Sequence, residues 1–179
     1  MDTQLIPSRF SRLCSLFPLV ALIATLASAA SPFAGAQDGK LQIAQLGKCA
    51  LESGKVIEDC QIGYRTFGQL NAVKSNAVLM PTWLYGTSED LLSLFSDELS
   101  TQQLVDTTRY FGIAIDALGN GVSSSPSNSK TQHGPAFPSF TIRDDINAEY
   151  RVMTEVLGLR HIHALLVLSM GGEQTFARC

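Results

Sequence analysis

Short apolar runs alternate with polar, glycine-rich stretches along most of the 179-residue chain. The runs at residues 77–80, 110–116 and 161–168 are each followed by turn-forming or polar residues, a pattern typical of strands that are covered on both faces. Between them, apolar residues recur at the three- and four-residue spacing of a helix within 90–99 and 141–157. The pattern therefore predicts strands that alternate with helices.

The stretch 141–157 carries the clearest helix signals. Thr141 and Asp144 have the spacing of a capping box, in which each side chain satisfies the other residue's backbone N–H group. Gly158 follows as a natural stop, because glycine readily adopts the left-handed conformation that ends helices. The spacing predicts a buried stripe made of Ile146, Tyr150, Met153 and Leu157.

Two further regions complete the predicted fold. Residues 46–67 are typical of a β-hairpin with its turn at Gly54, whereas 117–138 form a long loop rich in Gly, Ser, Asn and Pro. Loops of this length in compact domains tend to be functional or disordered. Strands that alternate with helices predict the α/β fold class, with a mainly parallel sheet and the hairpin as an antiparallel edge.

The first 36 residues read as a secretory signal peptide. Arg9 and Arg12 precede an apolar run at 16–30, and small residues follow up to Ala36. The run is shorter than the roughly 20 residues that a membrane-spanning helix needs, although an uncleaved anchor is the alternative. We therefore expect a signal peptide at 1–36, a partial domain at 37–179, a secreted or periplasmic location, and no stable membrane span after cleavage.

Charge and composition exclude several classes of function. The chain has 13 Lys and Arg against 16 Asp and Glu, a formal net charge of −3, and its basic residues are scattered. That distribution argues against a nucleic-acid partner. His133, His161 and His163 show no ligand spacing with the cysteines, so the sequence predicts no metal site and no cofactor.

The four cysteines divide into one candidate pair and two single residues. Cys49 and Cys60 flank the hairpin turn, and an oxidising compartment would permit a disulfide between them. The hairpin register decides whether their β-carbons approach each other, so both outcomes stay open. Cys14 lies in the signal segment, and Cys179 has no partner in the sequence.

Ser169 is the sharpest candidate for chemistry. It stands in the segment 167–172, Val-Leu-Ser-Met-Gly-Gly, between a buried strand and the start of a helix. A serine on such a turn projects its hydroxyl above the carboxyl end of the sheet, beside the free N–H groups and partial positive charge of a helix amino terminus. Both favour an oxyanion that forms during attack on a carbonyl. The alternative is an ordinary strand-to-helix junction with a serine cap.

Together with several other stretches, this segment resembles the homoserine O-acetyltransferase-like branch of the α/β-hydrolase superfamily. The resemblance runs from about residue 46 to 177, and several stretches occur in the family's order. They are residues 51–54 and 62–68 in the hairpin, 76–83 around the third strand, 118–128 in the long loop, and 137–138 and 141–144 before the next helix.

The resemblance implies a role for each matching residue. Ser169 corresponds to the nucleophile, and the backbone N–H of Met170 to one oxyanion donor. The second donor would be the N–H of Leu84, with Trp83 as the neighbouring candidate. Trp83 would either wall the acyl pocket or belong to the core. The implied activity is acyl transfer to an acceptor or hydrolysis of a small-molecule ester or other acyl donor.

The catalytic carboxylate and histidine follow the serine in this fold, so the resemblance places both beyond Cys179. His133, His161 and His163 all precede Ser169 and are poor candidates for the base. The carboxyl-terminal strands of the sheet would also lie beyond the chain. The open edge of the last strand then predicts self-association and poor solubility of the isolated chain.

Three features separate the sequence from the family. Val167 stands where a small residue is usual, and we expect its β-branched side chain to strain the turn. Residues 119–121 read Gly-Asn-Gly instead of the Gly-Gly-Cys of the biosynthetic members. An exported chain also favours an esterase as much as a homoserine acyltransferase. A non-catalytic remnant or binding module of the same fold is the main alternative, whereas the alternating helices count against a carbohydrate-binding domain.

Overall fold

The computed structural model describes residues 39–95 and 103–178 of the chain, and within them the polypeptide builds one five-stranded mixed sheet. The strand order is β1-β2-β4-β3-β5. β1 pairs antiparallel with β2, and β2 antiparallel with β4, whereas β4, β3 and β5 run parallel. The predicted α/β fold class, with a hairpin leading into parallel strands, is confirmed. The strands are β1 (Gln42–Ala50), β2 (Val56–Phe67), β3 (Ala77–Pro81), β4 (Phe111–Ile115) and β5 (Ala164–Leu165).

The hairpin of β1 and β2 is closed by a disulfide. The Cys49 and Cys60 sulfurs are 2.11 Å apart, and their α-carbons are 5.7 Å apart. Cys49 pairs with Ile57 and Cys60 with Gly47, so the two cysteines are not direct cross-strand partners. Two register shifts in β1, on either side of Gly47, bring them together.

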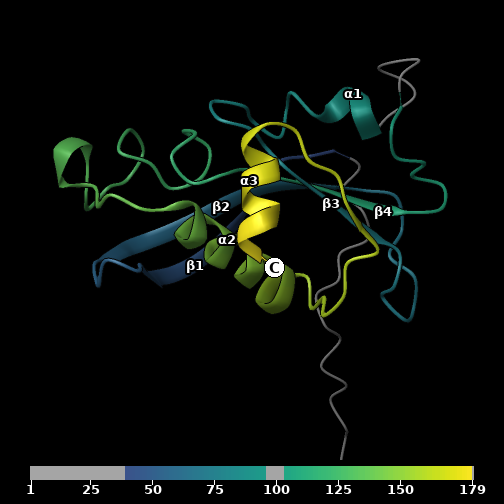
Figure 1. Ribbon diagram of the computed structural model, residues 1–179, viewed down its shortest axis with the longest axis horizontal. Helices are drawn as coiled ribbons and strands as arrows, with labels where there is room; N and C mark the ends of the chain where they lie inside the picture. Colours follow the sequence, from purple (N-terminus) through teal and green to yellow (C-terminus); the bar gives the residue numbers. More distant parts are fainter. Residues whose placement is uncertain (1–38, 96–102, 179) are drawn as a thin grey trace, which may run out of the picture. The chain divides into compact units, whose positions relative to one another are not determined.

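Both faces of the parallel strands are buried, as their continuous apolar sequences predict. Because side chains alternate along a strand, Ala77 and Leu79 of β3 belong to one core cluster, while Val78 and Met80 belong to the other. Helix α2 (Ile142–Arg151) covers the first face. Helix α1 (Leu92–Phe95) covers the second and lies apart from α2 and α3 (Met170–Arg178) in Figure 1.

Phe95 of α1 is fully buried because Gly112 of β4 leaves room for its ring. A β-carbon at position 112 would lie 2.4 Å from the Phe95 ring, closer than real side chains approach. Phe95 also stacks on Phe67 of β2, with ring centroids 4.6 Å apart. The single glycine in β4 thus lets a short helix seal this face of the sheet.

Helix α2 begins as predicted but buries a different set of side chains. The Thr141 side chain accepts a hydrogen bond from the Asp144 N–H, and the Asp144 carboxylate accepts one from the Thr141 N–H, which confirms the capping box. The predicted buried position of Tyr150 is wrong, since this side chain is 60% exposed. Glu149, the preceding residue, is fully buried instead.

The end of this helix departs from α-helical geometry. Residues Val152–Val156 form a π-helical turn (η2), which adds one residue to the hydrogen-bonded ring. Met153 and Leu157 remain buried, as expected. Gly158 ends the helix with φ of +62°, a conformation that a β-carbon would disfavour.

Two predicted elements are shorter than their apolar runs. The run 161–168 supplies only the two residues of β5, and the residues after Leu166 lead away from the sheet into α3. Helix α1 occupies four residues of the predicted 90–99, and residues 96–99 lie outside the described part of the chain. So does the predicted signal segment at 1–36. Among the described helices, none is long and apolar enough to cross a bilayer.

Candidate active site at the carboxyl edge of the sheet

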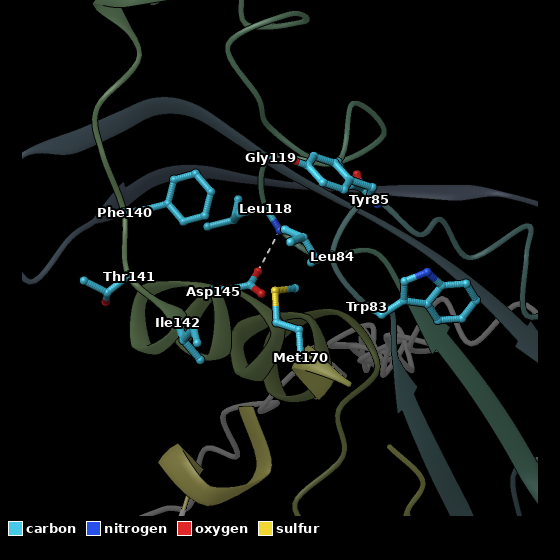
Figure 2. A pocket seen from close by; sticks show the side chains of 12 residues that line it. Trp83, Leu84, Tyr85, Leu118, Gly119, Phe140, Thr141, Ile142, Asp145 and Met170 are labelled. Atoms are coloured by element: carbon cyan, nitrogen blue, oxygen red, sulfur yellow. Dashed lines mark hydrogen bonds between the residues drawn. The ribbon is translucent and has the colours of Figure 1, made fainter. Parts of the chain in front are cut away.

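A pocket of about 210 Å³ opens beyond the carboxyl ends of β3 and β4. Parallel strands bring their carboxyl ends to one edge, where ligands of open α/β sheets generally bind. The segment after β3, the start of the long loop, and the first turns of α2 and α3 surround it (Figure 2). The lining is mainly apolar and consists of Trp83, Leu84, Tyr85, Ala117, Leu118, Gly119, Asn120, Phe140, Thr141, Ile142, Asp145 and Met170.

The segment after β3 is anchored at both ends. At its start, the Thr82 N–H donates to the Ile115 carbonyl (3.0 Å), and the Thr82 hydroxyl accepts from the Ala117 N–H (3.0 Å). At its end, the Gly86 carbonyl accepts from the Asn120 amide at 3.1 Å. Between these anchors Leu84 and Tyr85 are exposed, and Tyr85 has φ of +67°, unusual for a residue with a side chain. The backbone of this segment is therefore fixed while its side chains face outward.

Asp116, directly after β4, holds the segment after β3 and the long loop in place through hydrogen bonds. Its carboxylate is fully buried, and Oδ1 accepts from the Ser88 N–H (2.7 Å) and the Asn120 amide (2.9 Å). Gly63 of β2 permits the approach, since a β-carbon there would lie 2.7 Å from Oδ2. The Ser123 hydroxyl donates to the Asp116 carbonyl at 2.7 Å and accepts from the Gly63 N–H at 3.0 Å. These bonds tie the polar loop at 117–138 to the sheet.

Ser169 lies on a sharp reversal between β5 and α3. Leu166 still bonds to β3, because its N–H donates to the Leu79 carbonyl at 2.9 Å. Three residues later Ser169 has φ of +52°, is exposed, and directly precedes the first residue of α3, Met170. A non-glycine residue in this left-handed region costs about 1–2 kcal/mol and persists only where the surrounding structure imposes it.

The predicted strain at Val167 is not what the structure displays. The Val167 side chain is 37% exposed rather than wedged between strand and helix. Gly171 lies next to the sheet instead, with ordinary van der Waals room for a β-carbon. A β-carbon at 171 would lie 3.4 Å from the Pro81 carbonyl oxygen and 3.7 Å from the Val167 β-carbon. The helix can thus approach the sheet although a β-branched residue precedes the turn.

Trp83 lines the pocket and also packs on the core. Its indole lies against Gly86, where a β-carbon would come within 2.7 Å of the ring. The ring is partly buried and packs on the core cluster that contains Phe95. Figure 2 shows the indole directed away from Met170 and the centre of the pocket. Neither alternative from the sequence is sufficient on its own.

The three histidines lie away from this pocket. The His133 Nδ1 atom is 2.7 Å from the Pro126 carbonyl oxygen in the long loop. His163 packs against the Tyr110 ring, with centroids 5.1 Å apart, at the start of β5. His161 is exposed beside it. Within residues 39–95 and 103–178, no group of three metal-ligating side chains comes together.

Sequence reasoning missed the carboxylates that build the pocket walls. Asp116 and Asp145 are both buried, and each accepts a backbone N–H from a segment distant in the sequence. The signals available were an acid directly after a buried strand and a second acid directly after the capping acid. Neither signal reveals its partner, because the partner N–H groups arrive only through tertiary folding.

The sequence is similar to those of several enzymes. A protein from Corynebacterium glutamicum described as a probable esterase is 39% identical over 140 residues, covering 77% of this chain and 39% of that protein. An ethyl acetate hydrolase from Pseudomonas veronii is 34% identical over 139 residues, with the same coverage of both chains. The homoserine O-acetyltransferase of Nautilia profundicola is 32% identical over 138 residues, covering 69% of this chain and 37% of that enzyme.

The fold is also similar to that of solved enzyme structures. An acetylester hydrolase from Corynebacterium glutamicum superposes with a TM-score of 0.69 at 38% identity, covering 78% of this chain and 40% of that one. No family model matches the chain. The chain spans well under half the length of the relatives it matches.

Proposed function

We propose, on the premise that this chain belongs to the α/β-hydrolase superfamily and to its group of esterases and homoserine O-acetyltransferases, that Ser169 is the nucleophile of an acyl-transfer or ester-hydrolysis reaction. One observation carries the proposal. Ser169 holds φ of +52° between a parallel strand and a helix amino terminus, directly before Met170, which lines the pocket. Such strain is typical of the exposed nucleophile in this fold.

The reaction follows from that position. The Ser169 hydroxyl oxygen attacks the carbonyl carbon of the ester while a base removes the hydroxyl proton. The carbonyl π electrons move to the oxygen, which we place between the N–H groups of Met170 and Leu84. Each such donor is worth roughly 3–4 kcal/mol of transition-state stabilisation. Collapse expels the alcohol, which takes the proton, and leaves an acyl-serine.

The second half of the reaction decides between the two activities. Water attacking the acyl-serine would give hydrolysis, whereas an alcohol acceptor would give acyl transfer. In this fold the carboxylate and the histidine follow the nucleophile in the chain. We therefore assign both to the part of the relatives' length that this chain does not span.

The pocket supports a small-molecule ester or acyl donor as substrate. A volume of about 210 Å³ with a mainly apolar lining suits a short acyl group. Two relatives are named for the hydrolysis of acetate esters. Trp83 lines this pocket, but its indole packs on the core and is directed away from Met170 (Figure 2), so we do not assign the indole a contact with the acyl group.

We also propose that the chain is exported. The basic start, apolar run and small residues of 1–36 support a secreted or periplasmic location. The Cys49–Cys60 disulfide is consistent with an oxidising compartment. Mass spectrometry of the amino terminus of the exported protein tests this; an intact Met1 in a cytosolic fraction would contradict it.

A non-catalytic binding module of the same fold is the second candidate. It is favoured by the fact that none of the residues described around the pocket is a histidine.

We further propose that the outer edge of β5 pairs with a second chain, because no described strand covers it. A concentration-independent monomer in sedimentation velocity would contradict that association.

A fluorophosphonate probe tests the catalytic proposal on the chain extended to the length of its relatives, which includes the part to which we assign the base. We expect covalent labelling that Ser169→Ala abolishes and that Ser53→Ala leaves unchanged, because Ser53 lies in the exposed hairpin turn. Labelling that survives Ser169→Ala would assign the reaction to another serine. A folded wild-type chain that does not react would support the binding module.

A further inference from the structure

A pair of buried polar side chains connects the helix after Ser169 to the wall of the pocket. Asp145 on α2 is 3% exposed and Gln174 on α3 is fully buried. The Asp145 Oδ2 atom accepts a hydrogen bond from the Gln174 side-chain amide at 2.6 Å. Its other oxygen, Oδ1, accepts one from the backbone N–H of Leu118 at 2.7 Å. One carboxylate therefore contacts two separate walls of the site.

The two partners of Asp145 lie where the proposed chemistry needs fixed geometry. Leu118 begins the loop after β4 and lines the pocket, and Figure 2 shows the bond from its N–H to Asp145. Gln174 stands in the second turn of α3, the helix whose first residue is Met170. Met170 and Asp145 line the same pocket. The bond to Gln174 thus constrains the helix that carries the proposed oxyanion donor.

Because Asp145 and Gln174 are buried, removing either side chain should be costly. A buried polar group that loses its partner bears the full cost of its desolvation. The Gln174 Oε1 atom already lies buried without a hydrogen-bond partner among the described residues. The Gln174 side-chain amide group nevertheless donates to Asp145. An apolar side chain at this position would leave the buried Asp145 Oδ2 atom without this donor.

We propose that Asp145 and Gln174 form a positioning pair, which holds the amino terminus of α3, and with it Ser169 and the Met170 N–H, in register with the Leu118 wall. The functional part of this inference rests on the proposed role of Ser169. In this proposal the hydrogen bonds of Asp145 hold the amino terminus of α3 in place, and its negative charge does not. Misplacement of a catalytic group by about 1 Å can cost on the order of a hundredfold in rate.

Amide hydrogen exchange of the full chain tests the structural part without any activity. Asp145→Leu should speed exchange at the Leu118 N–H and in the first turn of α3 together. Gln174→Leu should speed exchange in α3 but leave Leu118 protected, because Oδ1 of Asp145 remains. Unchanged exchange at both places in a folded Asp145→Leu protein would overturn the proposal.

Asp145→Asn separates hydrogen bonding from charge. The asparagine oxygen can accept from Leu118, and its amide can donate to the Gln174 Oε1 atom if the glutamine amide turns over. The number of bonds stays the same, so we expect exchange at both places close to wild type. Exchange as fast as in Asp145→Leu would show that the charge matters, and the proposed cause would be wrong. This variant also gives a result if Asp145→Leu does not fold.

Asp144→Asn is the matched control, since Asp144 is the adjacent residue and equally buried at 3% exposure. Its carboxylate accepts from the Glu52 N–H at 2.7 Å and from the Thr141 N–H at 2.9 Å, away from Leu118 and α3. It should lower overall stability and leave the two reporter regions unchanged relative to the rest of the chain.

Fluorophosphonate labelling then connects the pair to Ser169. We expect labelling on the order of tenfold slower in Gln174→Leu, with Asp145→Asn close to wild type. Equal labelling rates in wild type and Gln174→Leu would overturn the functional part. If the wild-type chain does not label at all, the proposed function fails, and the exchange data alone decide whether the pair holds α3.

Discussion

The two edges of the sheet are built in different ways. At one edge, β1 and β2 pair over most of their length and share a disulfide, and Arg151 of α2 donates to the carbonyls of Leu46 (2.8 Å) and Lys48 (2.9 Å). At the other edge, β5 has two residues and leads at once into the strained turn at Ser169. The described cross-links are concentrated at the hairpin edge, whereas the short strand and the strained turn that precedes α3 lie at the other edge.

Removing the disulfide should have the largest effect on this contrast. Replacing Cys49 and Cys60 with alanine frees a loop of 11 residues in the unfolded chain, and we expect a loss of about 2–4 kcal/mol in the free energy of unfolding. Urea unfolding of the double variant measures it, with each single variant as a control. A loss below that of the β5 variant described next would remove the proposed difference between the edges.

At the opposite edge, Leu165→Ala should cost less. Leu165 is partly buried and packs against the core cluster under α2. Fully buried leucines cost about 2–5 kcal/mol on truncation, so we expect about 1–2 kcal/mol here. The same urea experiment measures the loss, and Leu79→Ala in the fully buried β3 is the matched comparison. Equal losses at 79 and 165 would mean that β5 is as firmly packed as the centre of the sheet.

Ser169→Gly should stabilise the chain relative to Ser169→Ala. Both lack the hydroxyl, but only glycine adopts φ of +52° without steric cost. We expect a difference of about 1 kcal/mol in favour of glycine. Thermal unfolding of the two variants measures it. Alanine as stable as glycine would show that the backbone at this turn carries no strain in solution.

The smallest expected effect is a pH dependence near the segment after β3. Hydrogen bonds from the Thr87 backbone N–H and hydroxyl lower the pKa of Asp90 below its usual value of 3.8. A lowered pKa in the folded state stabilises the fold above the pKa of the unfolded chain, and this contribution is lost as pH falls through the folded value. Below about pH 4, wild type should therefore lose its stability advantage over Asp90→Asn. A constant difference in urea midpoints between pH 3 and 6 would contradict this.

Local patterns predicted the elements well and their ends less well. The capping box of Thr141 and Asp144 depends on residues three apart, so the sequence contains all of its parts. The length of β5 and the exposure of Tyr150 depend on neighbours that only the folded chain supplies. Apolar spacing also does not predict the π-helical turn after residue 151.

In the candidate site, too, local features could be predicted from the sequence and contacts between distant segments could not. A serine between a strand and a helix is a local signal, and it leads directly to Ser169. The carboxylates of Asp116 and Asp145 are recognised only by their partners, Ser88 and Leu118, which are 28 and 27 residues away in the sequence. Sequence reasoning therefore found the proposed nucleophile and missed the groups that hold its surroundings.

The position of Trp83 has a practical consequence. It is the only tryptophan in the chain, it is one of the residues that line the pocket, and its ring lies against Gly86. Intrinsic emission excited at the indole band therefore reports on a single place in the molecule, without any attached dye. Titration with a candidate ester, followed by the wavelength of that emission, would give an affinity for the pocket before any turnover is measured.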